Sequence, residues 1–327
     1  MPKAPHPAAI IAAKDMSDAT RDRFIAVLTV FLVLAALVSL LAGAIALATD
    51  VATYENAKAT LLALGKTAAA IAAPEFYPLK QLRGAVEQTE IIGAALAILI
   101  GHRAAASERG HQTLALILTR PVRRWQFLAG KVMAGLVLLA VALAGVLVVC
   151  AVALHFGSGV GLGLADLWRI AIVWAVALAY TGCFFLLAFI LTLAMKRPPH
   201  ALLAAFIVWL MLVLIAPQIG DTLDPDNQVA GGVFKQLHIT KPDQMEILKG
   251  FAGYETVRTG IEAASLTKHF ERFGFAVLGI KDSYTGQPLG LILTEKWGDA
   301  LFILLSFLGL TTLALCLPLN PDRLTKE

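Results

Sequence analysis

The sequence predicts an all-α integral membrane protein with six transmembrane helices. Of its 327 residues, 58% are hydrophobic and only 15% are charged, whereas a soluble domain averages about 45–50% and about 25%. The apolar residues fall in separate blocks, and a run of about 20 is enough for one helix to cross a bilayer. Three smaller elements complete the fold class: an N-terminal interfacial helix, a short helix in a cytoplasmic loop, and a small helical extracytoplasmic subdomain.

The segment of residues 8–22, AAIIAAKDMSDATRD, predicts the interfacial helix. It is alanine-rich, weakly amphipathic and charged, as suits a helix that lies in the inner surface of the bilayer. An ordinary cytoplasmic tail is the alternative. The apolar block that follows is longer than the h-region of a signal peptide, which has about 7–15 residues, so we expect it to be retained as the first span.

The six spans divide the chain into three regions. Residues 1–219 form a transmembrane domain with five spans and a long cytoplasmic loop at 103–127, residues 220–296 form the extracytoplasmic subdomain, and residues 297–327 hold the sixth span and a cytoplasmic tail. The second span is the shortest, and the third and fourth are long enough to tilt or to extend into water. The predicted spans are 24–49, 86–101, 127–156, 167–195, 201–219 and 297–319.

The basic residues indicate the orientation, because short cytoplasmic loops carry an excess of lysine and arginine. With the N-terminus inside, the short outer loop 157–166 contains neither. The first outer loop, 50–85, counts against this orientation because it contains four basic residues. The balance still places both termini in the cytoplasm. The basic residues inside are then Lys3, Lys14, Arg21, Arg23, Arg103, Arg109, Arg120, Arg123, Arg124, Lys196, Arg197, Arg323 and Lys326.

The block 220–296 is the largest polar region. Its apolar residues recur at the spacing of a helix, and the segments 224–227 and 284–288 are rich in turn-forming residues. A block of this size cannot bury a large core alone. We therefore expect it to lean on the membrane domain or on a second copy of the chain. The recurring apolar residues are Ile247, Phe251, Val257, Ile261 and Ala264.

The loop between the second and third spans contains the sequence ASERGHQTLALILTRPVRRWQFLAGK, residues 106–131. Its apolar residues end at Leu118 and are followed by Thr119, Arg120 and Pro121. Because proline disfavours a helical residue just before it, a short helix is expected to end near Leu118, before a turn and a basic helix that leads into the third span. Such a helix suits docking to a soluble partner, and a helix that only anchors the loop is the alternative.

Seven residues of this region stand in a characteristic order: Glu108, Thr113, Leu114, Pro121, Arg124, Gly130 and Lys131. This order resembles the same loop of the type-2 ABC transporter permeases. In that family a glutamate precedes glycine-threonine-leucine, further leucines, a proline, an arginine and a glycine-lysine. One departure concerns Gln112, which occupies the family's glycine position, while Gly110 lies two residues earlier. The segment SLTKHFERFGFAVLG before the last span is also similar to a segment that many of these permeases carry.

The resemblance implies the membrane-spanning subunit of an ABC exporter in the bacterial inner membrane. Among such subunits, the chain is similar to the permease of the transporter for nitrous oxide reductase maturation. Two copies would assemble with two separate ATPase subunits, which would bind the ATP and Mg. Closure of the ATPase pair would push on the short helix at 108–118, the coupling helix, and the spans would open or close a path. The expected ATPase-coupling residues are Glu108, Thr113, Leu114, Pro121 and Arg124.

We expect the permease itself to have no catalytic residue, cofactor or metal site, and no nucleic-acid partner. The segment LGKT at 64–67 lacks the glycine that a phosphate-binding loop requires five residues before Gly65, where Thr60 stands. Cys150, Cys183 and Cys316 lie in separate predicted spans and form no CxxC motif. Topology and attraction to anionic lipid explain the net charge of +4.

Three residues are candidates for a path or gate. Glu87 and Glu90 share a helix face, and carboxylates at membrane depth usually face a cavity or a partner. They would then form an outer vestibule for polar or cationic cargo; the alternative is that both lie in water at the helix start. Pro217 is expected either to end the fifth span or to kink it as part of a gate. Asp166 and Arg169, three residues apart, are expected to form an ion pair.

Two functions from different classes stay open. The first is the permease of an ABC exporter. The alternative is a non-transporting membrane assembly or sensor protein that binds a periplasmic partner through its outer block. An intramembrane protease is not supported, because the spans contain no H-E-x-x-H motif. The sequence leaves the cargo undetermined among lipids, peptides and drugs, and only the resemblance suggests service to a periplasmic metalloenzyme.

Overall fold

The computed structural model describes residues 7–66, 77–110, 123–157, 162–222, 233–250 and 252–317. Over these ranges every regular element is helical. Six segments are long and apolar enough to cross a membrane, which confirms the predicted all-α integral membrane fold. We number them as spans 1–6: Arg23–Ala63, Pro78–Ser107, Arg124–His155, Leu164–Ala194, Pro198–Ile219 and Leu289–Cys316.

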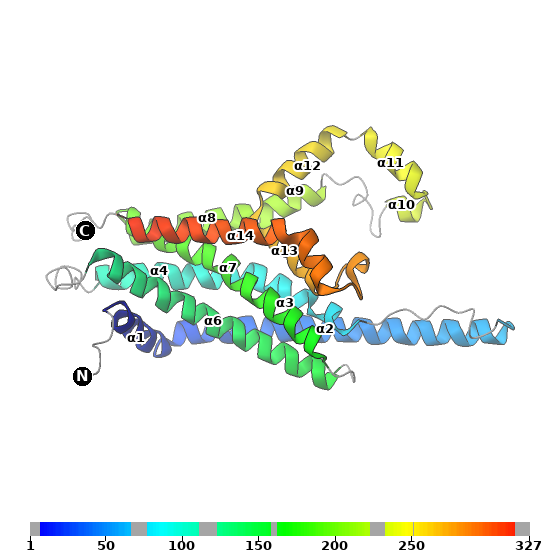
Figure 1. Cartoon of the computed structure of the whole chain (residues 1–327), viewed down its shortest axis with the longest axis horizontal. Helices are drawn as coiled ribbons and strands as arrows, with labels where there is room; N and C mark the ends of the chain where they lie inside the picture. The colour runs from blue at the N-terminus through cyan, green and yellow to red at the C-terminus, as the bar shows by residue number, and fades with distance from the viewer. Residues whose placement is uncertain are drawn as a thin grey trace.

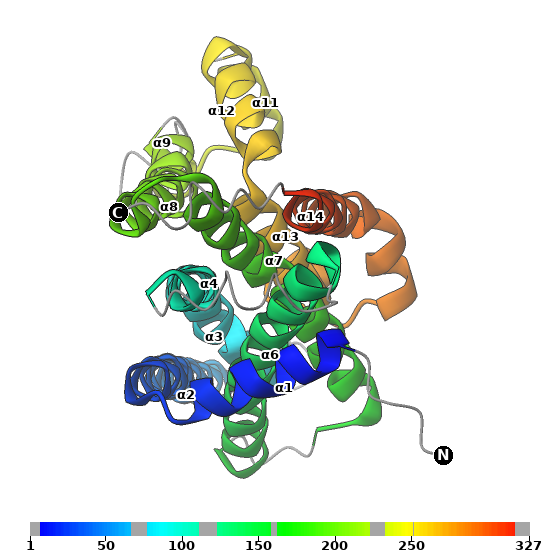
Figure 2. The ribbon, with the colours of Figure 1, turned by 90° about the vertical axis from the view of Figure 1, so that its left-hand side faces the viewer.

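The spans run side by side along the long axis of the molecule (Figure 1). Helix α1 (Pro7–Thr20) lies across one end of this bundle, over α6 and beside α2 (Figure 2). This end, which we call the α1 end, also holds the last turn of α4, the first turn of α6 and the turn between α7 and α8. The opposite end is called the arm end, because helices α10 to α12 project from it.

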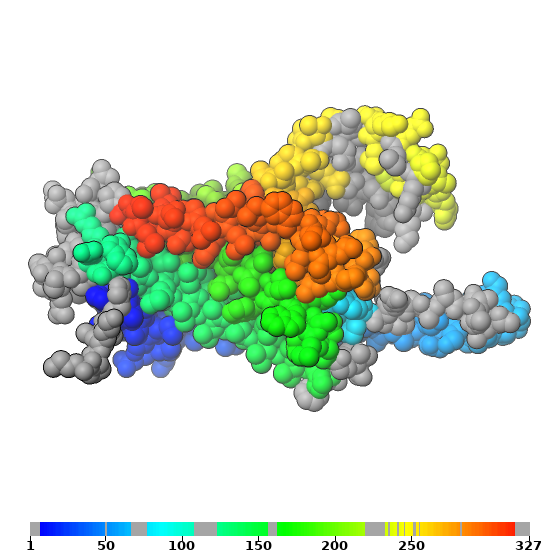
Figure 3. Space-filling model, in the orientation of Figure 1, coloured from blue at the N-terminus to red at the C-terminus, as the bar shows by residue number. Residues whose placement is uncertain are grey.

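Span 1 is a single helix of 41 residues, α2 (Arg23–Ala63). Asp22 caps its first turn by accepting a hydrogen bond from the backbone N–H of Phe24 at 3.0 Å. Leu32, Ala36 and Leu40 recur every four residues and are buried against the bundle. The helix continues well beyond residue 49, where the apolar run ends, and its far half projects beyond the bundle (Figure 3).

Span 2 is a continuous helical segment whose geometry changes along its length. It runs well beyond both ends of the apolar stretch at 86–101. At Thr89–Gly93 the helix widens by one residue per turn into a π turn, and such turns occur frequently at functional sites. Its four parts are the 3₁₀ helix η2 (Pro78–Leu82), α3 (Arg83–Gln88), the π helix η3 (Thr89–Gly93) and α4 (Ala94–Gly110).

Spans 3 and 4 are the helices α6 (Arg124–Gly157) and α7 (Leu164–Ala194). Span 4 is the most buried of the six. One side of it packs directly on span 2, where a Cβ at Gly101 would overlap the backbone carbonyl oxygen of Phe185. The two helices can therefore approach this closely only because Gly101 has no side chain.

Span 5 consists of α8 (Pro198–Trp209), the π helix η4 (Leu210–Ile215) and α9 (Ala216–Thr222). Pro217 is half-buried in the first turn of α9 and does not end the helix, which continues to Thr222. Proline lacks a backbone N–H and cannot complete the regular hydrogen-bond ladder. The π turn ends at Ile215, two residues before Pro217, which is consistent with this local loss of regular bonding.

The region between spans 5 and 6 has two different parts. The first is the arm, made of α10 (Val233–Gln236), α11 (Lys241–Lys249) and α12 (Ala252–Ala264). It projects from the bundle and touches it through α9 and α13 (Figures 1 and 2).

The second part, α13 (Leu266–Val277), packs into the bundle with Phe270 and Phe273 fully buried. A 3₁₀ turn, η6 (Asp282–Tyr284), then leads to α14 (Leu289–Cys316), which is span 6. His269 joins these elements: its Nδ1 lies 2.6 Å from Asp299 of α14, and its Nε2 lies 3.0 Å from the carbonyl oxygen of Ala263 in α12.

Candidate functional site

The loop expected to contact an ATPase is described only at its two flanks. Helix α4 reaches Gly110, and the chain is described again from Arg123. Thr113, Leu114 and Pro121 therefore lie outside the described residues, and Glu108 is placed only as part of the last turn of α4. Arg124 is the first residue of α6 and has an exposed side chain. The roles of all five residues stay predictions.

The flanks of this loop are joined by a buried lysine. Lys131, in the second turn of α6, is only 1% exposed. Its Nζ lies 3.0 Å from Oδ2 and 3.2 Å from Oδ1 of Asp15 in α1, and it donates a hydrogen bond to Oγ of Ser107 in α4 at 3.3 Å. One side chain thus connects α1, α4 and α6 at the α1 end.

Gly130 explains how α1 comes close enough for this contact. A Cβ at this position would lie 2.8 Å from the carbonyl oxygen of Ala8 and 2.9 Å from Cβ of Ile11. Both distances are below ordinary van der Waals contact, so α1 can rest on α6 only where a side chain is missing. The glycine-lysine pair of the family pattern therefore has two structural effects here: close approach and an ion pair.

A second ion pair connects the elbow between α1 and α2 to the other flank of the loop. The guanidinium of Arg103, in α4, pairs with the carboxylate of Asp22, which also caps α2. We call the two pairs, Asp15–Lys131 with Ser107 and Asp22–Arg103, the α1 clamp. A hollow of about 530 Å³ lies beside it between α1, α2, α4 and α6, lined by polar residues that include Asp18 and by apolar residues such as Leu138.

A second polar region lies in the middle of the bundle, where the two π turns meet. Helix η3 of span 2 touches η4 of span 5, and α13 touches both. The hydroxyl of Tyr180, in span 4, donates a hydrogen bond to the backbone carbonyl of Glu90 at 3.1 Å. The Tyr180 ring stacks on Phe270 of α13, with centroids 4.6 Å apart and 12° between the planes. We call this region the π-turn junction.

Glu87 and Glu90 have different surroundings although they share a helix face. The Glu87 side chain is 41% exposed and accepts a hydrogen bond from Arg83 Nε at 2.8 Å. Glu90 is 8% exposed, and its carboxylate makes no ion pair with any described residue. Lys268 and Glu271 of α13 lie near it and pair with each other at 2.9 Å. The alternative that both carboxylates lie in water therefore does not hold for Glu90.

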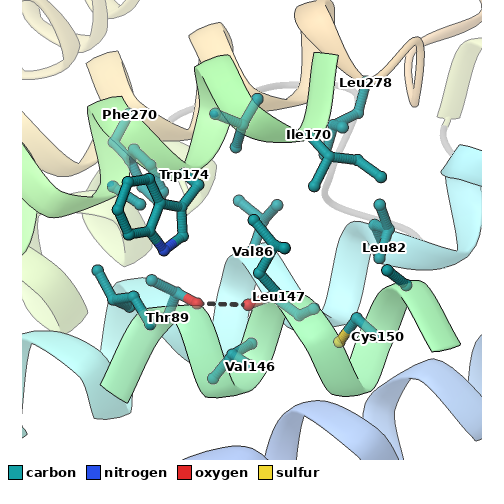
Figure 4. Close-up of a pocket in the computed structure, with 15 residues that line it drawn as sticks. Leu82, Val86, Thr89, Val146, Leu147, Cys150, Ile170, Trp174, Phe270 and Leu278 are labelled. Carbon is teal, nitrogen blue, oxygen red and sulfur yellow. Dashed lines mark hydrogen bonds between the residues drawn. The ribbon is translucent and has the colours of Figure 1, made fainter. Parts of the chain in front are cut away.

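A small apolar cavity adjoins this junction (Figure 4). It has a volume of about 70 Å³ and lies between Val86, Thr89, Trp174 and Phe270. Thr89 donates its hydroxyl hydrogen to the carbonyl of Ala85 at 2.8 Å. The indole N–H of Trp174 is buried and has no hydrogen-bond partner among the described residues, so the cavity wall carries one unsatisfied donor.

The comparison with protein families decides what kind of molecule this is. The chain matches the model of the ABC-2 family transporter proteins over residues 9–322. It belongs to the ABC-2 family. The match covers nearly the whole chain and confirms the resemblance to type-2 ABC permeases that the loop suggested. No curated protein shows a significant match to the chain.

As an ABC-2 protein, the chain is a multi-pass membrane permease, the membrane component of a transporter, and is not itself catalytic. Proteins of this family generally work with an ATPase subunit. In the described parts of the chain, no three His, Cys, Asp or Glu side chains gather closely enough to hold a metal ion.

At the arm end of this ABC-2 permease, Arg169 does not form the predicted ion pair with Asp166. It donates instead to the backbone carbonyls of Val277 and Gln287, at 2.8 Å for Val277. Asp166 accepts a hydrogen bond from the N–H of Gly163 at 3.0 Å and one from Tyr77 at 3.4 Å. Burial raises the pKa of Tyr77, and the positive charge of Arg169 opposes the rise.

The sequence indicates some of the residues of these polar regions but not the residues that they contact. Lys131 belongs to the family pattern, but its partner Asp15 lies 116 positions earlier, and no local spacing signals the pair. Tyr180 is one aromatic residue in a long apolar run. The spacing of Arg169 and Asp166 predicts an ion pair between sequence neighbours, but the partners of Arg169 are two carbonyls more than 100 positions away.

Proposed function

We propose that this ABC-2 permease is the membrane subunit of an exporter driven by a separate ATPase that binds the loop 103–127. The observation that carries the proposal is the α1 clamp. A loop that receives force from a soluble subunit must have a firm base, because displacement of a flexible base is not passed on to the spans. Here a buried ion pair and a second pair hold both flanks of the loop.

The ATPase contact is proposed to involve Glu108, Thr113, Leu114, Pro121 and Arg124. In support, Glu108 belongs to the last turn of α4 and Arg124 to the first turn of α6, so both adjoin the clamped flanks. The ATP and Mg would bind to the ATPase, since the permease sequence contains no phosphate-binding loop.

The α1 end is proposed to face the cytoplasm of a bacterial cell, with the protein in the inner membrane and both termini inside. In support, the short turns at this end carry several basic residues, whereas the short loop 157–166 at the other end carries none, and short cytoplasmic loops carry such an excess. The arm would then lie outside the cytoplasm. The described basic residues at the α1 end include Lys14, Arg21, Arg23, Arg103, Arg109, Arg123, Arg124, Lys131, Lys196 and Arg197.

The path or gate is proposed to lie at the π-turn junction, with Glu87, Glu90 and Pro217 as its polar and hinge residues. A buried carboxylate at membrane depth suits a polar or cationic group of the cargo. π turns interrupt regular hydrogen bonding and give a helix a place to bend. Pro217 lies two residues after the end of one of these turns.

A homodimer of permeases with two ATPase subunits is proposed from the family resemblance. The alternative function, a non-transporting assembly or sensor protein with a periplasmic partner, is favoured by one feature. The arm projects from the bundle and exposes Tyr254 and Val257. A role in nitrous oxide reductase maturation would be compatible with either function. This role is proposed from the resemblance alone.

Copurification tests the proposed function. The tagged permease should recover an ABC ATPase, identified by mass spectrometry and by ATP hydrolysis that vanadate inhibits. Glu108→Ala and Pro121→Ala should weaken this association or uncouple it from transport without loss of membrane insertion. Glu246→Ala, on the exposed surface of α11, is the matched control. Normal ATPase association and coupling in both loop variants would place the contact elsewhere.

Removal of the arm separates the two functions. Replacement of residues 233–264 by a short flexible linker leaves α13 and span 6 intact. Under the export proposal, the shortened protein should still bind its ATPase and respond to ATP. If the shortened protein loses only a periplasmic protein that copurifies with the full chain, the assembly function is favoured instead.

A further inference from the structure

We propose that Lys131 is a positioning residue that makes helix α1 a moving part of the coupling apparatus and not only an anchor in the membrane surface. Through Lys131, α1 would follow the loop 103–127 and transmit its displacement to span 1. This inference rests on the proposed function, because it assumes that an ATPase acts on the loop.

The first step concerns burial. A lysine that is 1% exposed is seldom retained unless its charge is paired and hydrogen-bonded. The Lys131 ammonium has three hydrogens, and described contacts reach both oxygens of Asp15 and the hydroxyl of Ser107. The ammonium also lies over the ring of Phe127, with Nζ 5.6 Å from the ring centroid. This group therefore holds one defined position among three helices.

The second step concerns the apolar part of the attachment of α1. Ala8 and Ala12 are buried, Ile11 is partly buried against α6 at Gly130, and Ile10 is 55% exposed. Apolar packing is not directional, so it holds α1 on α6 but does not by itself fix where α1 lies along that helix. Close packing at Gly130 sets the separation from α6, and the Asp15–Lys131 pair sets the position of α1 along it.

The third step concerns the other flank of the loop. Arg103 in α4 pairs with Asp22. Asp22 lies between α1 and α2, directly before the first residue of α2. Ser107 lies one helical turn further along α4 and binds Lys131. Both flanks are thus tied to one short stretch of chain, from Asp15 in the second half of α1 to Asp22 at the start of span 1.

These ties predict a specific motion. If the loop is displaced, α4 and α6 cannot move at their α1 ends without carrying α1 and the start of α2 with them. The hollow beside the clamp leaves space between α1, α2 and α4 for such a shift. The start of span 1 should therefore move with these ends of spans 2 and 3, and the tilt of span 1 relative to span 4 should change.

Spin labels test this motion in the complete permease–ATPase complex. Leu64 at the tip of span 1 and Leu164 at the start of span 4 are both highly exposed and can be replaced by cysteine, with the exposed Cys316 replaced by serine. We expect the distance between the two labels to change when ATP and vanadate are added. The test variant is Lys131→Met with Asp15→Leu, which replaces the ion pair by apolar side chains that such sites often tolerate.

The double variant is expected to bind the ATPase as the parent protein does but to lose the ATP-dependent change in distance. Lys58→Met with Glu55→Leu removes an exposed ion pair on the same helix as the Leu64 label and should keep the change. If the double variant does not fold, Asp15→Asn, which removes only the charge, gives the same test. Lys131→Arg keeps the positive charge and should retain the ATP-dependent change in distance.

Two results would overturn the inference. An unchanged distance response in the folded Lys131→Met, Asp15→Leu variant would show that α1 is not a coupling element, while the proposed function would stand. Absence of an ATPase from the parent preparation would overturn the proposed function, and the inference with it.

Discussion

The hydroxyl of Tyr180 donates a hydrogen bond to the backbone carbonyl of Glu90 across 3.1 Å. This bond links span 4 to the π turn of span 2, where the regular helical ladder is interrupted. A buried carbonyl without a partner is costly in a membrane interior. Tyr180 therefore stabilises an irregular turn that also places the Glu90 carboxylate beside α13.

Replacement of Tyr180 by phenylalanine should lower the free energy of unfolding by about 1 kcal/mol, because the carbonyl of Glu90 loses its partner while the ring packing is retained. Thermal unfolding in detergent measures the effect. Tyr254→Phe, at an exposed position of the arm, should leave the midpoint unchanged. An equal midpoint for both variants would mean that the hydrogen bond contributes nothing to stability.

Glu90→Gln and Glu87→Gln should behave differently. At Glu90 the amide replaces a buried ionisable group that no described residue pairs, so thermal stability should rise while ATP-dependent transport activity falls. At Glu87 only an exposed ion pair with Arg83 is lost, so stability should change by no more than about 0.5 kcal/mol. A fall in stability with full activity in Glu90→Gln would contradict a role in the path.

Gly101→Ala should destabilise the protein by roughly 1–3 kcal/mol, because the added methyl group overlaps the carbonyl oxygen of Phe185 and must separate spans 2 and 4. Gly309→Ala is the matched control in span 6, where a Cβ would have no atom within 4 Å. It should be neutral or stabilising, by up to about 1 kcal/mol. The two midpoints of thermal unfolding are the measurement.

Arg169→Lys should loosen the segment between α13 and span 6. The arginine reaches two separate carbonyls, those of Val277 and Gln287, and an ammonium cannot reproduce this forked geometry. Limited proteolysis should then cut the segment 278–288 faster than in the parent protein. Lys281→Arg, on the exposed surface of that segment, is the control. Equal cleavage rates in the two variants would show that Arg169 does not hold the segment in place.

Cysteine labelling tests the orientation. Leu164→Cys, at the exposed start of span 4, should react with an impermeant reagent in whole cells, and Arg197→Cys, in the turn between spans 4 and 5, should react only after permeabilisation. Both proteins carry Cys316→Ser. Ser107 is unsuitable as a label site because Lys131 donates to its hydroxyl. The opposite pattern of labelling would reverse the topology.

The sequence predicts the fold class because the apolar blocks are long enough to cross a bilayer. It is less informative about where helices end. Hydropathy measures transfer into lipid, whereas the polar ends of span 2 are covered by protein, as at Gln81, which is buried. The second half of α2 was expected as a loop because it is polar, although its alanines favour a helix.

The candidate site could be predicted only in part. The family pattern indicates the loop 103–127 as the expected contact with an ATPase, and the cost of carboxylates at membrane depth makes Glu90 a candidate; both roles stay predictions. The π turns could not be predicted, because one extra residue in a turn leaves no mark on composition and depends on a distant partner such as Tyr180. The Asp15–Lys131 pair likewise depends on how α1 folds back over α6.

The length of α2 has a mechanical consequence. At about 1.5 Å per residue, its 41 residues form a rod of about 61 Å, roughly twice the thickness of the hydrocarbon core. A tilt of α2 by about 10° about its start at Asp22 would sweep the far tip through roughly 10 Å. If an ATPase acts at the α1 end, as proposed, a small change in the tilt of span 1 would become a large stroke at the opposite surface, where the tip could push a neighbouring protein without any cargo crossing the bilayer.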